Sequence, residues 1–179
     1  MTHWDGIARK GYITLHHTAT ASSDTTNHTA PSDCSTIGYD FQVLADGTIY
    51  PGGRKFESPG CHGRSCNCNS TGIALTGCFG GCSGNTGNAY PTTAQECAVG
   101  YIWAHTGIPS GPGKIKPHRW CAFETPCDTP GTSTVCPGTN LTGNGGAASD
   151  YFNQAGIDMR NRLDAKRNQY AGCDACACT

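Results

Sequence analysis

The sequence has little charge and no long apolar segment. Charged residues make up 14% of the chain, and the formal net charge at pH 7 is −1. A chain this close to neutrality lacks the basic surface that attracts nucleic acid or an anionic membrane. No apolar run approaches the roughly 18–20 residues that a transmembrane helix requires. We therefore expect neither a nucleic-acid partner nor a membrane partner.

The first residues, MTHWDGIARKGY, also lack the apolar stretch of a signal peptide. Cysteine, by contrast, is abundant, because the chain contains 13 of these residues. Disulfides persist in extracellular proteins, whereas a reducing cytosol keeps thiols free and reactive. We therefore expect a secreted, disulfide-rich protein, either a trimmed mature form with an added Met or one that leaves its cell by another route, such as lysis.

The odd number of cysteines leaves at least one without a partner in the chain. That residue is either a free or intermolecular thiol or a metal ligand, and parity alone does not choose between these two possibilities.

Length and hydrophobic pattern predict one α/β domain. A chain of 179 residues suffices for one sizeable core and is too short for two comfortable domains. Residues 12–17 and 72–79 are predicted to be buried strands, and residues 37–50 a hairpin around Asp46-Gly47. Thr93-Ala-Gln-Glu96 is a capping box that predicts the start of a helix.

A second amphipathic helix is predicted from near residue 149, and a Cys-rich tail follows it to residue 179. One apolar stripe of this helix contains Phe152, Ala155, Met159 and Leu163. The elements together predict a single domain over residues 1–179 with a central mixed β-sheet flanked by helices.

Two histidines, His16 and His17, end the first predicted strand, and His118 follows much later in the chain. A histidine pair at a strand end is most often structural, although imidazole is also a common zinc ligand. Adjacent residues of a strand face opposite ways, so at most one of the pair points into a given site.

A series of short motifs carries more information than any single residue. LHHTAT, IGYDFQVLADGTIYPGGR, HGRSCNCNSTGIALTG, TTAQ, PHRW and VCPGTNL occur in that order. This series resembles the zinc-dependent N-acetylmuramoyl-L-alanine amidases, a family that includes amidase-type phage lysozymes and animal peptidoglycan recognition proteins. The resemblance covers about residues 12–141, and it implies an amidase-like fold with peptidoglycan, both glycan strand and stem peptide, as the partner of a monomer.

The resemblance also implies a site. It implies that one Zn²⁺ per chain is bound by His16, His118 and Cys136, with Tyr39 beside the metal and Thr134 two residues before the cysteine. By the same resemblance His62 and Asn69 line the peptidoglycan groove, and His17 lies next to it.

The implied reaction is hydrolysis of the amide bond between the lactyl group of N-acetylmuramic acid and L-alanine. Three protein ligands leave a position for water, and the Tyr39 and Thr134 hydroxyls are candidates to stabilise the oxyanion. A related intracellular branch of the fold uses a glutamate on the strand that matches GIALTG, where this chain has Ala74 and Thr76. Acid–base chemistry is therefore expected from Tyr39 or from water itself.

The third ligand has a competitor in the sequence. Asp128 closes the site by analogy with the intracellular branch, but Thr129 separates it from the following Pro-Gly. Cys136 runs directly into Pro137-Gly138, as the extracellular members do. The motif favours Cys136, and Asp128 stays as the alternative.

Two other functions compete with the amidase hypothesis. One is a non-catalytic recognition protein that binds peptidoglycan without cleaving it. The other is a disulfide-rich structural or effector protein with an incidental histidine pair, which would leave the ordered motifs unexplained.

Overall fold

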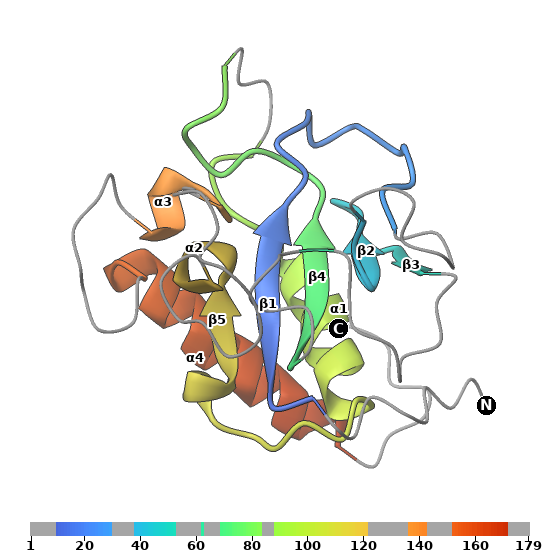
Figure 1. Cartoon of the computed structure of the whole chain (residues 1–179), viewed down its shortest axis with the longest axis vertical. Coiled ribbons are helices and arrows are strands. Elements are labelled where there is room, and N and C mark those ends of the chain that lie inside the picture. Colours follow the sequence, from blue (N-terminus) through green and yellow to red (C-terminus); the bar gives the residue numbers. More distant parts are fainter. Residues whose placement is uncertain are drawn as a thin grey trace.

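A computed structural model of the chain describes residues 10–29, 38–52, 62, 69–83, 88–121, 136–142 and 152–171, apart from the side chain of Cys121. These residues form one five-stranded sheet with helices packed on it (Figure 1). The strands are β1 (Tyr12–His17), β2 (Phe41–Val43), β3 (Ile49–Pro51), β4 (Ser70–Leu75) and β5 (Ile115–Pro117). The helices are α1 (Thr93–Ala104), the 3-10 turn η2 (Pro112–Lys114), α2 (His118–Cys121), α3 (Thr139–Thr142) and α4 (Gln154–Tyr170).

The sheet is mixed, as predicted. Its strand order is β3-β2-β4-β1-β5, and only the β2–β3 pair is antiparallel. The central strand β1 lies parallel to β4 on one side and to β5 on the other. Because β1, β4 and β5 run the same way, the segments that follow them meet at one edge of the sheet.

Strand alternation gives the sheet two different faces. Ile13 and Leu15 of β1 and Ile73 of β4 belong to the hydrophobic core, together with Trp103 of α1 and Leu163 of α4. Thr14 and His16 of β1, which alternate with the core residues, therefore point to the opposite face. The same register places Gly72 beside Thr14 and Ala74 beside His16 on that second face.

The Asp46-Gly47 hairpin turn is confirmed, and the buried strand predicted over residues 72–79 is present with different bounds. Gly47 has a positive φ of 90°, and the Leu44 N–H donates to the Thr48 carbonyl oxygen at 2.9 Å. The later strand, β4, begins at Ser70 and ends at Leu75, because the chain turns at Gly77, whose φ is 143°. Only a glycine adopts such a φ without strain, so the apolar run continues past the strand as a loop.

The first helix has its capping box one residue earlier than predicted, at Thr92 and Gln95. Thr92 Oγ1 accepts from the Gln95 N–H at 3.1 Å, and Gln95 Oε1 accepts from the Thr92 N–H at 3.0 Å. The buried Gln95 side chain also donates to the carbonyl oxygens of Val43 and Thr76. These tertiary bonds explain the register, because they require Gln95, rather than Glu96, to face the sheet.

The last helix, α4, starts at Gln154 rather than near residue 149, and the side chain of Asn153 caps it. Phe152, Met159 and Leu163 of the predicted stripe are buried, whereas Ala155 is only half-buried. The Cys-rich tail, 172–179, lies outside the described residues. None of the helices in the described residues is both long and apolar enough to cross a membrane.

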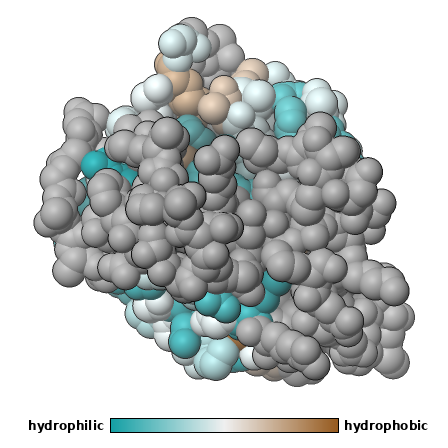
Figure 2. All heavy atoms as spheres, in the orientation of Figure 1, coloured by the Kyte–Doolittle hydropathy of each residue, from teal (hydrophilic) through white to brown (hydrophobic). Residues whose placement is uncertain are grey.

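The described surface offers little apolar area. Tyr90 is the one large apolar side chain exposed among the described residues, at 52%. The space-filling view agrees, with described residues coloured mainly hydrophilic and a small apolar area at the upper edge (Figure 2).

Helices α1 and α4 touch most closely at Gly100. A Cβ at this position would lie 2.5 Å from the Lys166 Cβ and 3.0 Å from its backbone carbon. We expect Gly100→Ala to lower the free energy of unfolding by about 1–3 kcal/mol, because overpacking outweighs the gain in helix propensity of roughly 1 kcal/mol. Urea unfolding with disulfides intact measures this. Gly113→Ala, with nothing within 4 Å of its Cβ, is the matched control and should change stability little. Equal stabilities of the two variants would contradict the close helix contact.

Candidate functional site

Three predicted ligands converge at the edge of the sheet where β1 and β5 end. His16 is in β1, and His118 directly follows β5, whose Pro117 pairs with Leu15. The two imidazole rings are 4.4 Å apart between centroids, and Cys136 Sγ lies 3.8 Å from His16 Nδ1. One donor atom from each of His16, His118 and Cys136 lies within 4.8 Å of the others. The structure therefore brings together residues that are 120 positions apart in the sequence.

The position of Cys136 depends on the backbone around it. The Arg119 N–H donates to the Cys136 carbonyl oxygen at 3.0 Å, which ties the cysteine to the segment that carries His118. Four residues after the cysteine, the Asn140 N–H donates to the Phe79 carbonyl oxygen at 2.9 Å. Gly138 has a φ of 126°, and a Cβ there would lie 2.4 Å from the Phe79 carbonyl oxygen. Gly138 is thus required for the close approach of this segment to the loop after β4.

Burial sets the protonation of all three groups. Desolvation, followed by the neighbouring His118, His62 and His17, holds the pKa of His16 well below its usual value of 6.5. Burial lowers the pKa of His118 to about 4, and it raises the pKa of the Cys136 thiol to about 12 against the opposing effect of a hydrogen bond from the His17 backbone. At neutral pH both imidazoles are therefore uncharged and offer lone pairs, while the thiol keeps its proton until a cation replaces it.

This donor set fits zinc. Two neutral imidazoles and one thiolate are among the ligands that zinc prefers, and three protein ligands leave a fourth position of a tetrahedron open. Burial of Cys136 and His16, at 7% and 1% exposure, keeps the donors away from competing water. A catalytic rather than a structural metal is expected from a three-ligand set.

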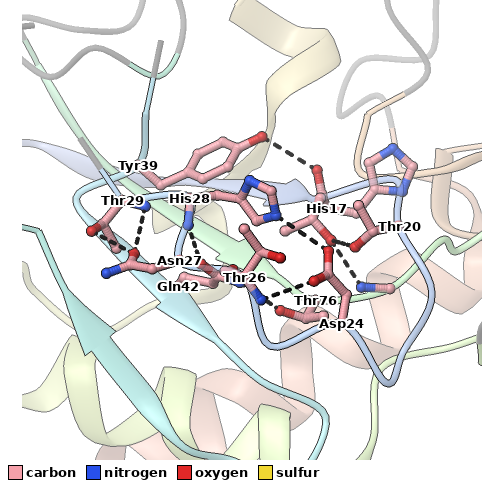
Figure 3. A network of polar contacts seen from close by, with 12 residues as sticks. His17, Thr20, Asp24, Thr26, Asn27, His28, Thr29, Tyr39, Gln42 and Thr76 are labelled. Atoms are coloured by element: carbon pink, nitrogen blue, oxygen red, sulfur yellow. Dashed lines mark hydrogen bonds and ion pairs between the residues drawn. The ribbon is translucent and has the colours of Figure 1, made fainter. Parts of the chain in front are cut away.

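Tyr39 lies beside the three donors, as predicted. Its ring centroid is 5.0 Å from that of His16, and its hydroxyl points toward the His17 carbonyl oxygen at 3.5 Å (Figure 3). Burial and the nearby Cys136 raise the pKa of Tyr39 to about 12. The raised pKa keeps the phenol protonated at neutral pH, so it is a hydrogen-bond donor there.

His17 and Asn69 do not join this cluster. The His17 ring accepts from the Phe79 N–H at 3.4 Å, and burial lowers its pKa to about 4. Asn69 is exposed and directly precedes β4, whose Ala74 pairs with His16, so it lies on the order of 16 Å along the sheet from the ligand end. A groove contact for these two residues stays a prediction.

His62 is close to the cluster but buried beneath it. The residue is 2% exposed, and its Nδ1 is 3.0 Å from His16 Nε2. The ring thus contacts a predicted ligand and offers almost no surface to a bound glycan. Thr134 and Asp128 lie outside the described residues, so their roles stay predictions.

The sequence analysis missed a buried charged pair below His62. Asp40 Oδ2 accepts from Lys10 Nζ at 3.3 Å and from the Gly72 N–H at 2.8 Å, and it lies 3.7 Å from His62 Nε2. Lys10 and Asp40 are 6% and 3% exposed. The one available signal was a carboxylate directly after the motif tyrosine.

A second group of metal-binding residue types is not a metal site in this structure. His17, Cys78 and Cys82 lie close together, but Cys78 and Cys82 form a disulfide with an S–S distance of 1.92 Å. Their sulfur atoms are therefore bonded to each other and are not thiolate ligands.

Comparison with known proteins identifies the family. A family model described as N-acetylmuramoyl-L-alanine amidase matches residues 8–139, so the chain belongs to this family. A search of curated proteins gave no match.

Solved structures with a related fold come from bacteria, phages and animals. They include Drosophila PGRP-LB, at 24% identity and TM-score 0.52 over 77% of this chain and 79% of that chain. The Ph2119 endolysin from Thermus scotoductus MAT2119 bacteriophage Ph2119 follows at 21% identity and TM-score 0.50, covering 84% of each chain. The N-acetylmuramoyl-L-alanine amidase LysC from Clostridium intestinale URNW is 26% identical with TM-score 0.47, over 74% of this chain and 78% of that chain. The two likenesses at TM-scores of 0.50 and 0.52 show an amidase and recognition-protein fold.

Among the described residues, Cys136 is one of two cysteines that are not in a disulfide. Cys97 in α1 is also a buried thiol. Alkylation of the unreduced protein, unfolded in the presence of a chelator, should therefore label both Cys97 and Cys136, because neither is in a disulfide. Cys78 and Cys82 should stay unlabelled until a reductant is added. Peptide mapping by mass spectrometry gives the result, and a disulfide at Cys136 would remove that residue from the ligand set.

Proposed function

We propose that this protein is a zinc-dependent amidase that hydrolyses the bond between N-acetylmuramic acid and L-alanine in peptidoglycan, outside the cell that makes it. The observation that carries the proposal is the buried cluster of His16, His118 and Cys136 with Tyr39 beside it. Membership of the amidase family supports the substrate class.

The three ligands would hold the zinc ion, and the neighbouring side chains would handle the substrate. A bound zinc ion supplies Lewis acidity, which polarises a carbonyl group and makes water a better nucleophile near neutral pH. The protein contributes neutral imidazoles at His16 and His118 and one thiolate at Cys136, so the donor set carries a single negative charge. That low charge leaves most of the cation's electrophilic character for the substrate.

Tyr39 is the described side chain best placed to assist the reaction. Attack of water on the amide carbonyl converts it into a tetrahedral oxyanion, which a phenol can stabilise by donating a hydrogen bond. The raised pKa of Tyr39, about 12, keeps that proton on the phenol throughout the neutral range. The partner on β4 that faces His16 is Ala74, so this strand supplies no carboxylate to act as a base. Thr134 remains the predicted second donor.

The first experiment asks whether the protein cleaves peptidoglycan and at which bond. We expect new N-terminal alanine amino groups in a digest, no new reducing sugar ends, and about one zinc per chain. Treatment with 1,10-phenanthroline should abolish cleavage, whereas the non-chelating 1,7 isomer should not. New reducing ends would mean a glycosidase. Sedimentation of the protein with peptidoglycan without any cleavage would favour a recognition protein.

The second experiment removes one hydroxyl. Tyr39→Phe should keep zinc and stability but slow turnover by about 10- to 1000-fold, the range for loss of one oxyanion or proton-transfer donor. Because the phenol is protonated well below its pKa of about 12, the rate ratio of wild type to variant should be constant from pH 6 to pH 9. Tyr50→Phe on β3 is the matched control and should retain full turnover. Unchanged turnover in Tyr39→Phe would exclude Tyr39 from the reaction.

A further inference from the structure

The Nε2 atom of His16 lies within hydrogen-bonding distance of another histidine. Cys136 Sγ lies on the Nδ1 side of the His16 ring at 3.8 Å, and His62 Nδ1 lies on the other side, 3.0 Å from His16 Nε2. The two rings are nearly perpendicular, at 81°. Both side chains are almost fully buried, so this contact is not shared with bulk solvent.

The far nitrogen of His62 faces acceptors. Its Nε2 is 3.4 Å from the Ser70 carbonyl oxygen, 3.5 Å from Ser70 Oγ and 3.7 Å from Asp40 Oδ2. The Ser70 carbonyl oxygen and the Asp40 carboxylate can only accept a hydrogen bond, whereas the Ser70 hydroxyl can donate or accept. These partners favour a proton on His62 Nε2.

The tautomers of both rings follow from this arrangement. A neutral imidazole carries one proton, so a His62 ring that donates from Nε2 has an acceptor at Nδ1. His16 Nε2 then donates to that acceptor, which leaves the lone pair of His16 on Nδ1. This lone pair is on the side of the ring that faces Cys136.

We propose that His62 is a positioning residue, which fixes His16 as the Nε2–H tautomer and thereby directs His16 Nδ1 to the metal. In this role His62 binds no substrate, and Asp40 and Ser70 orient it from below. The inference rests on the proposed metal site. Partners of this kind behind metal-binding histidines fix ring orientation and raise metal affinity.

The sheet is shaped to admit the His62 ring. A Cβ on Gly72 would lie 2.2 Å from His62 Cγ. The ring therefore occupies the space that the side chain of any residue other than glycine would fill at this position. The Gly72 N–H also donates to Asp40 Oδ2 at 2.8 Å. One glycine thus makes room for the ring and holds the carboxylate that faces its far nitrogen.

Two substitutions at His62 test whether its hydrogen-bond acceptor at Nδ1, rather than the rest of the side chain, is what affects zinc binding. Asn places an amide oxygen near the position of the imidazole Nδ1, whereas Gln places its amide near Nε2 and has no acceptor near Nδ1. We expect His62→Gln to weaken zinc binding about 10- to 100-fold and His62→Asn to restore most of the affinity. Competition with a chromophoric chelator measures both on the full chain with disulfides intact. His105→Gln, at the end of α1, is the control histidine and should leave zinc affinity unchanged.

The second measurement needs no metal. Nitrogen-15 NMR of the metal-free wild type should show His16 as the Nε2–H tautomer, and His62→Gln should shift the population toward Nδ1–H. An Nδ1–H tautomer in the wild type, or wild-type zinc affinity in His62→Gln, would overturn the proposal. If the wild type binds no zinc, the proposed function fails, and the tautomer alone then decides whether His62 orients His16. A thermal melt of each metal-free variant separates these effects from loss of the fold.

Discussion

The alternation of the β1 side chains between the two faces of the sheet is the constraint on which the rest of the structure depends. This strand lies between β4, with which it pairs along its whole length, and β5, with which it pairs from Ile13 to Leu15, so its register is fixed on both sides. Ile13 and Leu15 enter the core, and His16 therefore faces the opposite side with Thr14. A slip of one residue would replace His16 by His17 at the site and expose the core residues. The hydrophobic core thus selects which histidine of the pair faces the other ligands.

Burial then prepares these side chains to bind a cation. Desolvation opposes charge on the imidazoles and on the cysteine alike, so the metal-free cluster is neutral at physiological pH. A neutral cluster presents no positive charge to repel a cation, and loss of the Cys136 proton on metal binding would supply the compensating negative charge. The same desolvation keeps Tyr39 protonated, so one environment prepares both the ligands and the hydrogen-bond donor.

Much of this could be predicted from the sequence, and the failures have physical causes. The Asp46-Gly47 turn, α1 and the three convergent ligands follow from local patterns or from the ordered motifs. The position of the capping box does not follow from local patterns. It depends on Gln95, whose side chain donates to the carbonyl oxygens of Val43 and Thr76, and both residues are distant in sequence. The end of β4 depends on the φ of Gly77, and periodicity carries no information about that angle.

Cysteine parity failed for a different reason. It assumes that every cysteine other than the metal ligand is oxidised, whereas Cys97 is a thiol buried in α1. Parity therefore gives no support to Cys136 over Asp128. The preference now depends on geometry, because Cys136 Sγ is within 3.8 Å of His16 and its backbone is tied to the His118 segment.

Under the proposed function, the position of Asp40 explains why a tyrosine rather than a carboxylate would assist the reaction. Asp40 is separated from His16 by the ring of His62, and its Oδ2 already accepts hydrogen bonds from Lys10 and Gly72. At 3% exposure its side chain is buried, and its Oδ2 lies 3.7 Å from His62 Nε2. A carboxylate held this way can orient the imidazole above it but cannot take a proton from an attacking water. Under the proposed function, Tyr39 is the described group beside the three predicted ligands that has a proton to donate. The two tasks would then be separate, because the carboxylate would help to orient His62 and the phenol would assist the reaction.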